Sequence, residues 1–145
     1  RGRLSRRILE DMMATRTSVS TGTSWEAMAG YARAVRVGAQ IWVSGTTATD
    51  AHGKVVALGD PAGQARFIID KIERAITQLG GSLRDVVRTR VYVSDIAHWE
   101  PVARAHGERF GEIRPANTLV EGRLVGPEYL VEIEADAFVS DAHSA

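Results

Sequence analysis

Two stretches of the chain place charged side chains at every second position, which is the spacing of one face of a β-strand. One carries the carboxylates of Glu132, Glu134 and Asp136, and the other carries the guanidinium groups of Arg88 and Arg90. If these strands are neighbours, the two rows meet as cross-strand ion pairs. Such pairs on a solvated face would contribute little to stability. The pattern alone does not decide whether this charged face is solvated or packs as an interface.

The sequence lacks the residues that several other kinds of site require. The sequence has no cysteine, which excludes disulfides, thiolate metal sites and a cysteine nucleophile. The four histidines, His52, His98, His106 and His143, include no pair with a metal-binding spacing such as H-E-x-x-H. The glycines from Gly59 to Gly63 lack the Gly-Lys-Ser/Thr of a phosphate-binding loop. We therefore expect no metal and no cofactor.

Composition limits the number of domains and argues against nucleic-acid and membrane partners. The 145 residues suffice for one domain. Eighteen basic residues balance eighteen acidic ones, so bulk charge gives no support to a nucleic-acid partner. No apolar run reaches the roughly 18 residues of a membrane span, and we expect no membrane partner. A chain without cysteine is compatible with a reducing cytoplasm, where we expect this protein to reside.

Two helices are predicted to support the charged strands. The first begins at Asp60 and Pro61, an N-cap acid followed by a proline at the first helical position, and it ends at Gly80. Its apolar residues recur at spacings of three and four, so it should lie on one face of a sheet. They are Ala65, Ile68, Ile69, Ile72, Ala75, Ile76 and Leu79. The second helix is predicted over residues 96–110, with these inner residues: Trp99, Val102, Ala103 and Phe110.

Strands are predicted from β-rich runs and from alternation, over residues 34–37, 40–44, 85–93, 116–121 and 130–139. Within the third strand one apolar face is expected to hold Val87, Thr89, Val91 and Val93. Residues 15–24 are rich in Thr, Ser and Gly and are predicted to form a loop. The order β-β-α-β-α-β-β predicts an α+β domain, a mixed sheet with two helices on one face.

This arrangement leaves one face of the sheet without helices. That face carries the two charged rows together with Tyr92 and Trp42. Either it is solvated and covered with ion pairs, or it packs against copies of the chain, because aromatic and arginine side chains are enriched at interfaces.

Four ordered segments resemble the RidA (YjgF/YER057c/UK114) family. They are residues 31–45 (YARAVRVGAQIWVSG), 85–95 (DVVRTRVYVSD), 114–121 (RPANTLVE) and 131–135 (VEIEA). The resemblance extends over most of the chain, from position 29 to position 139.

The resemblance sets the expected domain boundaries. A family domain is expected over residues 29–140, after an N-terminal extension over residues 1–28 and before a tail over residues 141–145. Residues 1–11 stay outside the fold prediction, either as an upstream extension or as part of a native amphipathic helix from Leu4 to Met13.

The resemblance implies a chorismate-mutase-like fold in which three subunits pack their sheets around a central barrel. The polar sheet faces then turn inward and small-molecule clefts form between subunits, which favours the interface interpretation. Typical members hydrolyse reactive enamines and imines, such as 2-aminoacrylate, to 2-oxo acids and ammonia without a metal or organic cofactor. Other relatives are described as endoribonucleases or translation inhibitors.

The resemblance also assigns residues to the cleft. Tyr31, Ser44, Gly45 and Thr118 match substrate-binding positions. Glu132 matches the glutamate that positions a water for attack on the imine carbon. The alternative interpretation is that Glu132 only pairs with an arginine of the neighbouring charged row.

Three cleft positions depart from the family pattern. Asn117 stands where an arginine clamps the substrate carboxylate, and an amide brings neither the charge nor the fork geometry. Leu119 replaces a common cysteine, and Ala103 replaces a frequent asparagine. Strand alternation puts Asn117 and Leu119 on one face, consistent with both lining the cleft. Arg90 is the first candidate for a substitute clamp and Arg114 the second, although each is alternatively a structural residue.

We therefore predict a homotrimeric, cofactor-independent hydrolase that acts on a small enamine, imine or related metabolite, with an atypical substrate. One alternative is a non-catalytic module that binds a small metabolite or a protein. A third function, endoribonuclease or translation inhibitor, is disfavoured by the balanced charge.

Overall fold

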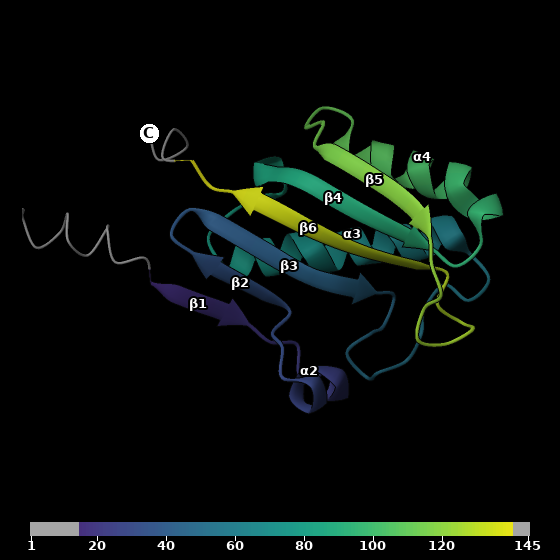
Figure 1. The fold of residues 1–145 in the computed structure, drawn as a ribbon, viewed down its shortest axis with the longest axis horizontal. Helices are drawn as coiled ribbons and strands as arrows, with labels where there is room; N and C mark the ends of the chain where they lie inside the picture. The colour runs from purple at the N-terminus through teal and green to yellow at the C-terminus, as the bar shows by residue number, and fades with distance from the viewer. Residues whose placement is uncertain (1–14, 141–145) are drawn as a thin grey trace, which may run out of the picture.

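Six β-strands form one sheet in the computed structural model, which describes residues 15–140. The order across the sheet is β1-β2-β3-β6-β4-β5 (Figure 1). β4 and β5 run parallel, and the other neighbours are antiparallel. The strands are β1 (Arg16–Val19), β2 (Ala34–Val37), β3 (Gln40–Thr47), β4 (Val86–Val93), β5 (Ala116–Glu121) and β6 (Val131–Phe138). The predicted α+β class with a mixed sheet is confirmed.

Two helices, α3 (Pro61–Gln78) and α4 (Trp99–Phe110), lie on one face of the sheet, behind it in Figure 1. The N-cap of α3 is the predicted one, because the Asp60 carboxylate accepts a hydrogen bond from the Gly63 backbone N–H. The predicted apolar stripe of α3 is buried, and its fully buried members are Ala65, Ile68, Ile69, Ile72 and Ile76. Burial of this stripe against the sheet is the main source of the domain's stability.

The second helix begins later than predicted. Residues 96–98 form a 3₁₀ turn, and α4 proper starts at Trp99. Its buried residues are Val102, Ala105 and Phe110. Trp99, which was expected on the inner side, is 52% exposed because it stands at the helix start, outside the buried stripe.

Two irregularities in strand pairing decide which side chains face the helices. In β4 the register shifts between Val86 and Arg88, so Val86 is buried and Val87, predicted on the apolar face, is 53% exposed. In β3 the register with β6 shifts between Val43 and Thr46. A β-bulge re-aims the side chains around it, and the bulge in β3 lies beside the candidate site.

The loop predicted over residues 15–24 is confirmed only for residues 20–23. β1 pairs with β2 at the edge of the sheet, and the short helix α2 (Ser24–Ala29) follows it. The hydroxyl groups that suggested a loop instead donate hydrogen bonds to the buried carboxylate of Glu26, from Ser20, Thr21 and Thr23. Burial alone would raise the pKa of Glu26, but these bonds outweigh it and hold the pKa at about 2.

The alternatives for residues 1–11 and the tail expected over residues 141–145 lie outside the described residues. Between residues 15 and 140, no helix has the length and apolar character that crossing a membrane requires.

The other face of the sheet carries no helix in Figure 1 and holds the two charged rows. Arg90 forms ion pairs with Glu134 at 3.5 Å and with Asp136 at 3.2 Å, as predicted for neighbouring strands. Tyr92 donates a hydrogen bond to Glu134, and Trp42 on the same face is 43% exposed. These pairs hold β4 and β6 in register and leave the first glutamate of the acidic row outside the network.

Candidate functional site

A cavity of about 230 Å³ opens where β3 ends and β6 begins. Its wall includes Tyr31, Arg33, Gly45, Thr47 and Glu132, and α2 also contributes to the lining. Three residues assigned from the sequence, Tyr31, Gly45 and Glu132, therefore meet at one cavity within a single subunit.

Glu132 presents an unpaired carboxylate to this cavity. The residue is partly buried, and within the described part of the chain no side chain or backbone group hydrogen-bonds to it. Its register partners are Thr47 and Tyr92, so no arginine stands opposite it and the ion-pair interpretation does not apply. Burial raises the pKa of Glu132, while Arg33 lowers it and Glu134 raises it further. The result is a carboxyl group with a raised pKa and free oxygen atoms.

Gly45 makes room for this carboxylate. A β-carbon at position 45 would lie 3.2 Å from both Cδ and Oε2 of Glu132. Gly45 belongs to the bulge of β3, where the pairing with β6 is interrupted. The absent side chain thus allows the carboxyl group to pack directly on the backbone.

Arg33 is a cation that the sequence analysis did not identify. Its side chain is 5% exposed, and Nη1 donates hydrogen bonds to the Gly45 carbonyl at 2.8 Å and to the Thr46 hydroxyl at 3.1 Å. Its guanidinium carbon lies 5.6 Å from the centre of the Tyr31 ring. Nε is buried and has no hydrogen-bond partner among residues 15–140. Arg33 precedes the first predicted strand, so the one available signal was its position two residues after Tyr31.

Lys71 is a second cation that the sequence did not single out. From α3 its Nζ donates hydrogen bonds to the carbonyl oxygens of Thr47 at 3.3 Å and Thr49 at 2.9 Å. Burial, followed by the guanidinium groups of Arg33 and Arg74, lowers the pKa of Lys71 to about 8. In the sequence it belonged to the polar side of an amphipathic helix, and such positions are usually solvated.

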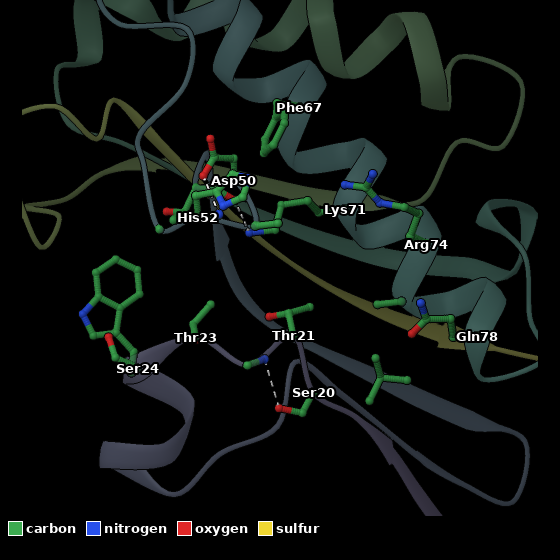
Figure 2. Close-up of a pocket in the computed structure, with 17 residues that line it drawn as sticks. Ser20, Thr21, Thr23, Ser24, Asp50, His52, Phe67, Lys71, Arg74 and Gln78 are labelled. Carbon is green, nitrogen blue, oxygen red and sulfur yellow. Dashed lines mark hydrogen bonds between the residues drawn. The ribbon is translucent and has the colours of Figure 1, made fainter.

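A larger cavity of about 840 Å³ adjoins the first. The residues lining both cavities are Thr23, Trp25, Thr49 and Lys71. Figure 2 shows Lys71 extending from α3 toward the loop of Asp50 and His52. Hydrogen bonds from the backbone N–H groups of Lys54 and His52 lower the pKa of Asp50. Among residues 15–140, no group of three histidine or acidic side chains is placed to hold a metal ion.

Comparison with known proteins shows which family the chain belongs to. The family model described as Endoribonuclease L-PSP matches residues 21–139. A relative named 3-aminoacrylate deaminase RutC, from Acinetobacter baylyi, is 34% identical over 112 residues, which cover 77% of this chain and 89% of the relative. The chain belongs to the RidA (YjgF/YER057c/UK114) family. The resemblance inferred from four sequence segments is confirmed.

Solved structures share the fold of this RidA-family chain. Rv2704 from Mycobacterium tuberculosis, described as a member of the YjgF/YER057c/UK114 family, is 46% identical with a TM-score of 0.78. That match covers 86% of this chain and 100% of Rv2704. PA3499 from Pseudomonas aeruginosa, described as a protein of unknown function, is 30% identical with a TM-score of 0.72, and the match covers 88% of this chain and 95% of that chain.

The remaining residues that the RidA resemblance assigned lie outside the cavity of Glu132. The Ser44 hydroxyl donates a hydrogen bond to the Ala32 carbonyl at 2.7 Å, so it braces the strand end beside the cavity. Arg90 is engaged with acids of β6 on the open face. Arg114 lies in the turn before β5 with a φ of 56°. Neither arginine borders the cavity, whereas Arg33 does.

The signature strand β5 lies at the edge of the sheet, with β4 between it and the strand of Glu132. On β5, Asn117 donates a hydrogen bond to the Thr89 hydroxyl at 2.9 Å, and that hydroxyl also contacts His106 Nε2 at 2.8 Å. Burial lowers the pKa of His106. Leu119 is partly buried against the core, so both side chains share the helix-covered face.

Thr118 points the other way along the same strand. Its hydroxyl accepts a hydrogen bond from Arg88 at 3.5 Å on the open face of the sheet. Within one subunit, therefore, Asn117, Thr118 and Leu119 do not reach Glu132. Their assignment to the RidA cleft stays a prediction that depends on a neighbouring subunit.

Proposed function

We propose that this protein is a cofactor-independent hydrolase that deaminates a small enamine or imine, with Glu132 as the general base. The observation that carries the proposal is the partly buried, unpaired carboxylate of Glu132 in a cavity that it shares with Tyr31 and Arg33. The relative named as a 3-aminoacrylate deaminase supports this class of reaction at the level of the family.

In the proposed reaction Glu132 moves one proton twice. Its carboxylate first accepts a proton from water while the water oxygen adds to the protonated imine carbon. The carbinolamine then collapses: the C–N bond breaks, the C=O bond forms, and the nitrogen leaves as ammonium with the hydroxyl proton and the proton from Glu132. A raised pKa suits both steps, because a general base works best when its pKa approaches the operating pH.

Arg33 supplies positive charge to the cavity that Asn117 cannot supply. A buried guanidinium favours a substrate that carries a carboxylate or another anionic group. Because Nη1 of Arg33 already donates to the Gly45 carbonyl and the Thr46 hydroxyl, we expect attraction rather than a bidentate clamp. Simple 2-aminoacrylate should therefore be a weaker substrate than it is for relatives with an arginine on β5.

We also propose that the working unit is a homotrimer. The open sheet face exposes Trp42 on β3 and Val120 on β5, which flank its charged rows on either side, a mixture that suits an interface better than a solvated surface. A neighbour packed there could bring its β5 edge, with Asn117, toward the cavity of Glu132. Multi-angle light scattering at micromolar concentration should give three times the mass of one chain, and a monomer would rule the shared cleft out.

The direct test measures ammonia released from enamines and imines generated in solution, both with and without a carboxylate. Glu132→Gln should lower turnover by about 100-fold or more, because it removes the proton acceptor. The matched control is Glu134→Gln on the same strand and face, which should retain turnover because Glu134 only pairs with Arg90 and Tyr92. Equal activity of Glu132→Gln and wild type would contradict the proposal.

A non-catalytic, metabolite-binding module is the second candidate, and the asparagine at position 117 favours it. Calorimetry with small acids and amides, followed by a turnover assay on each ligand that binds, separates the two. Binding without turnover for every ligand would select the module. Ribonuclease or translation-inhibitor activity is the third candidate: the description of the matching family model names an endoribonuclease, but the formal net charge of zero disfavours binding to RNA.

A further inference from the structure

Lys71 stands in the wall shared by the two cavities, and the proposed hydrolysis does not use it. The whole sequence holds two lysines, Lys54 and Lys71. Lys54 is exposed in the turn that follows β3, whereas Lys71 is partly buried on α3. One lysine amine therefore lies at a cavity and the other lies in solvent, so their reaction rates can be compared within one protein.

The hydrogen bonds of Lys71 suit a neutral amine. Its Nζ donates to the carbonyl oxygens of Thr47 and Thr49, and no carboxylate pairs with it within residues 15–140. A neutral amine has two N–H groups and one lone pair. With both N–H groups held by backbone carbonyls, the lone pair is left free to meet a ligand. A lysine that served only as a structural cation would usually be paired with an acid.

The charges around Lys71 also favour the neutral form. Two cations act on it, Arg33 in the wall of the smaller cavity and Arg74 one turn along α3. The nearby acids, Glu26 and Asp50, oppose them only in part. The carboxylate of Glu26 accepts hydrogen bonds from hydroxyl groups of the preceding turn, and the carboxylate of Asp50 accepts hydrogen bonds from two backbone N–H groups. Desolvation and neighbouring cations are the two means by which proteins activate a lysine amine.

The remaining titratable group on this side is His52, which lines the larger cavity opposite α3 (Figure 2). Arg74 makes no ion pair with any described residue and lines the same cavity. An anionic ligand that enters this cavity thus meets free positive charge beside the amine.

We propose that Lys71 is a nucleophilic amine that captures small carbonyl compounds bearing an anionic group, 2-oxo acids in particular, as an imine at the junction of the two cavities. The Nζ lone pair adds to the carbonyl carbon to form a carbinolamine. The C–O bond then breaks, the oxygen leaves as water with the two amine protons, and the C=N bond remains. No oxidant, metal or cofactor is needed, and the step does not depend on hydrolysis by Glu132.

The experiment traps the imine in the folded, wild-type protein. Pyruvate is added with sodium cyanoborohydride, which reduces the imine to a stable secondary amine, and the labelled lysine is identified by peptide mass spectrometry. At pH 7 we expect Lys71 to be labelled on the order of 10 to 100 times faster than Lys54, because far more of its amine is neutral. Labelling of Lys71 should reach half its maximum near pH 8, the value to which its pKa is lowered.

Four comparisons make the result decisive. Lys54→Arg should keep the label on the cavity lysine, and Lys71→Arg should abolish it while keeping the positive charge. Propanal, which has no anionic group, should label Lys71 less selectively than pyruvate. Glu132→Gln should leave labelling intact, so that loss of hydrolysis and loss of labelling can be told apart.

Two outcomes would overturn the proposal. One is equal labelling of both lysines in the folded protein, and the other is a half-maximum above pH 10 at Lys71. If Lys71→Arg does not fold, the ratio of the two lysines within wild-type protein still decides. The same ratio measured in urea supplies the unfolded reference, in which the preference should vanish.

Discussion

The carboxyl group of Glu132 packs on the backbone of Gly45 so closely that a β-carbon there would lie 3.2 Å from its Cδ and Oε2 atoms. The position of this carboxyl group therefore depends on a missing side chain at position 45. The two positions are brought together by the bulge in β3, which is a local feature of strand pairing.

Gly45→Ala should displace the Glu132 carboxyl group by a few tenths of an ångström and reduce turnover by about 10-fold or more, because small misplacements of a catalytic group are costly. The fold should persist. Gly107→Ala in α4 is the matched control, since no atom lies within 4 Å of the added methyl group. It should raise the free energy of unfolding by about 0.5–1 kcal/mol and leave turnover unchanged. Thermal unfolding and ammonia release measure both, and a fully active Gly45→Ala would contradict the argument.

Replacing Glu132 by glutamine should make the protein more stable at neutral pH. Burial raises the pKa of Glu132 in the folded state, so between the unfolded and folded values the folded chain holds more protons and stability falls as pH rises. Glutamine does not ionise, so Glu132→Gln does not lose this stability as the pH rises. Denaturant unfolding should show equal stability of the two proteins below the ordinary glutamate pKa. Above it, Glu132→Gln should gain about 0.5 kcal/mol, because solvent screens a partly exposed carboxylate. A variant less stable than wild type at pH 7 would refute this.

The charge of Arg33 should affect the pH at which activity falls on the acid side of the pH–rate profile. Its positive charge lowers the pKa of Glu132, so Arg33→Met should move that pKa upward and shift the acid limb to higher pH. Arg33→Lys keeps the charge and should shift the limb less. NMR titration of the glutamate carboxyl carbons gives the same pKa without requiring activity. Identical limbs in Arg33→Met and wild type would show that the two charges do not interact.

Gln64 ties α3 to the segment that leads into β6, and its loss should be costly. It is fully buried, its amide donates to the Glu128 carbonyl at 2.9 Å, and its oxygen accepts from the Leu130 N–H at 2.8 Å. Gln64→Ala should lower the free energy of unfolding by about 1–3 kcal/mol, because the part-buried Glu128 carbonyl and Leu130 N–H lose their partner. Gln78→Ala at the exposed end of α3 should change it by about 0.5 kcal/mol or less. Equal effects in denaturant unfolding would contradict this assignment.

Much of the fold could be predicted because its signals are periodic. The stripe from Ala65 to Leu79 and the alternation from Val131 to Phe138 each report one buried face, and burial of that face is what forms the element. The exceptions are places where periodicity breaks. A bulge exposes Val87, and the hydroxyl-rich residues before α2 satisfy a buried carboxylate, which no alternation reveals.

The site was only partly predictable. Glu132, Tyr31 and Gly45 were found through the resemblance to the family, and they do line one cavity. Arg33 and Lys71 were not found, because their importance comes from burial and from neighbours distant in sequence. Lys71 receives its environment from backbone carbonyls at Thr47 and Thr49, and a sequence pattern carries no information about such contacts.

The carboxylate of Glu26 accepts its hydrogen bonds from within six residues of itself, at Ser20, Thr21 and Thr23. The turn and α2 are thus fastened to each other by local contacts. At the end of α2, Gly30 takes a φ of 75°, which glycine reaches without strain. A segment built in this way should open as one unit and not residue by residue. Its amide hydrogens should therefore exchange with solvent as one kinetic group.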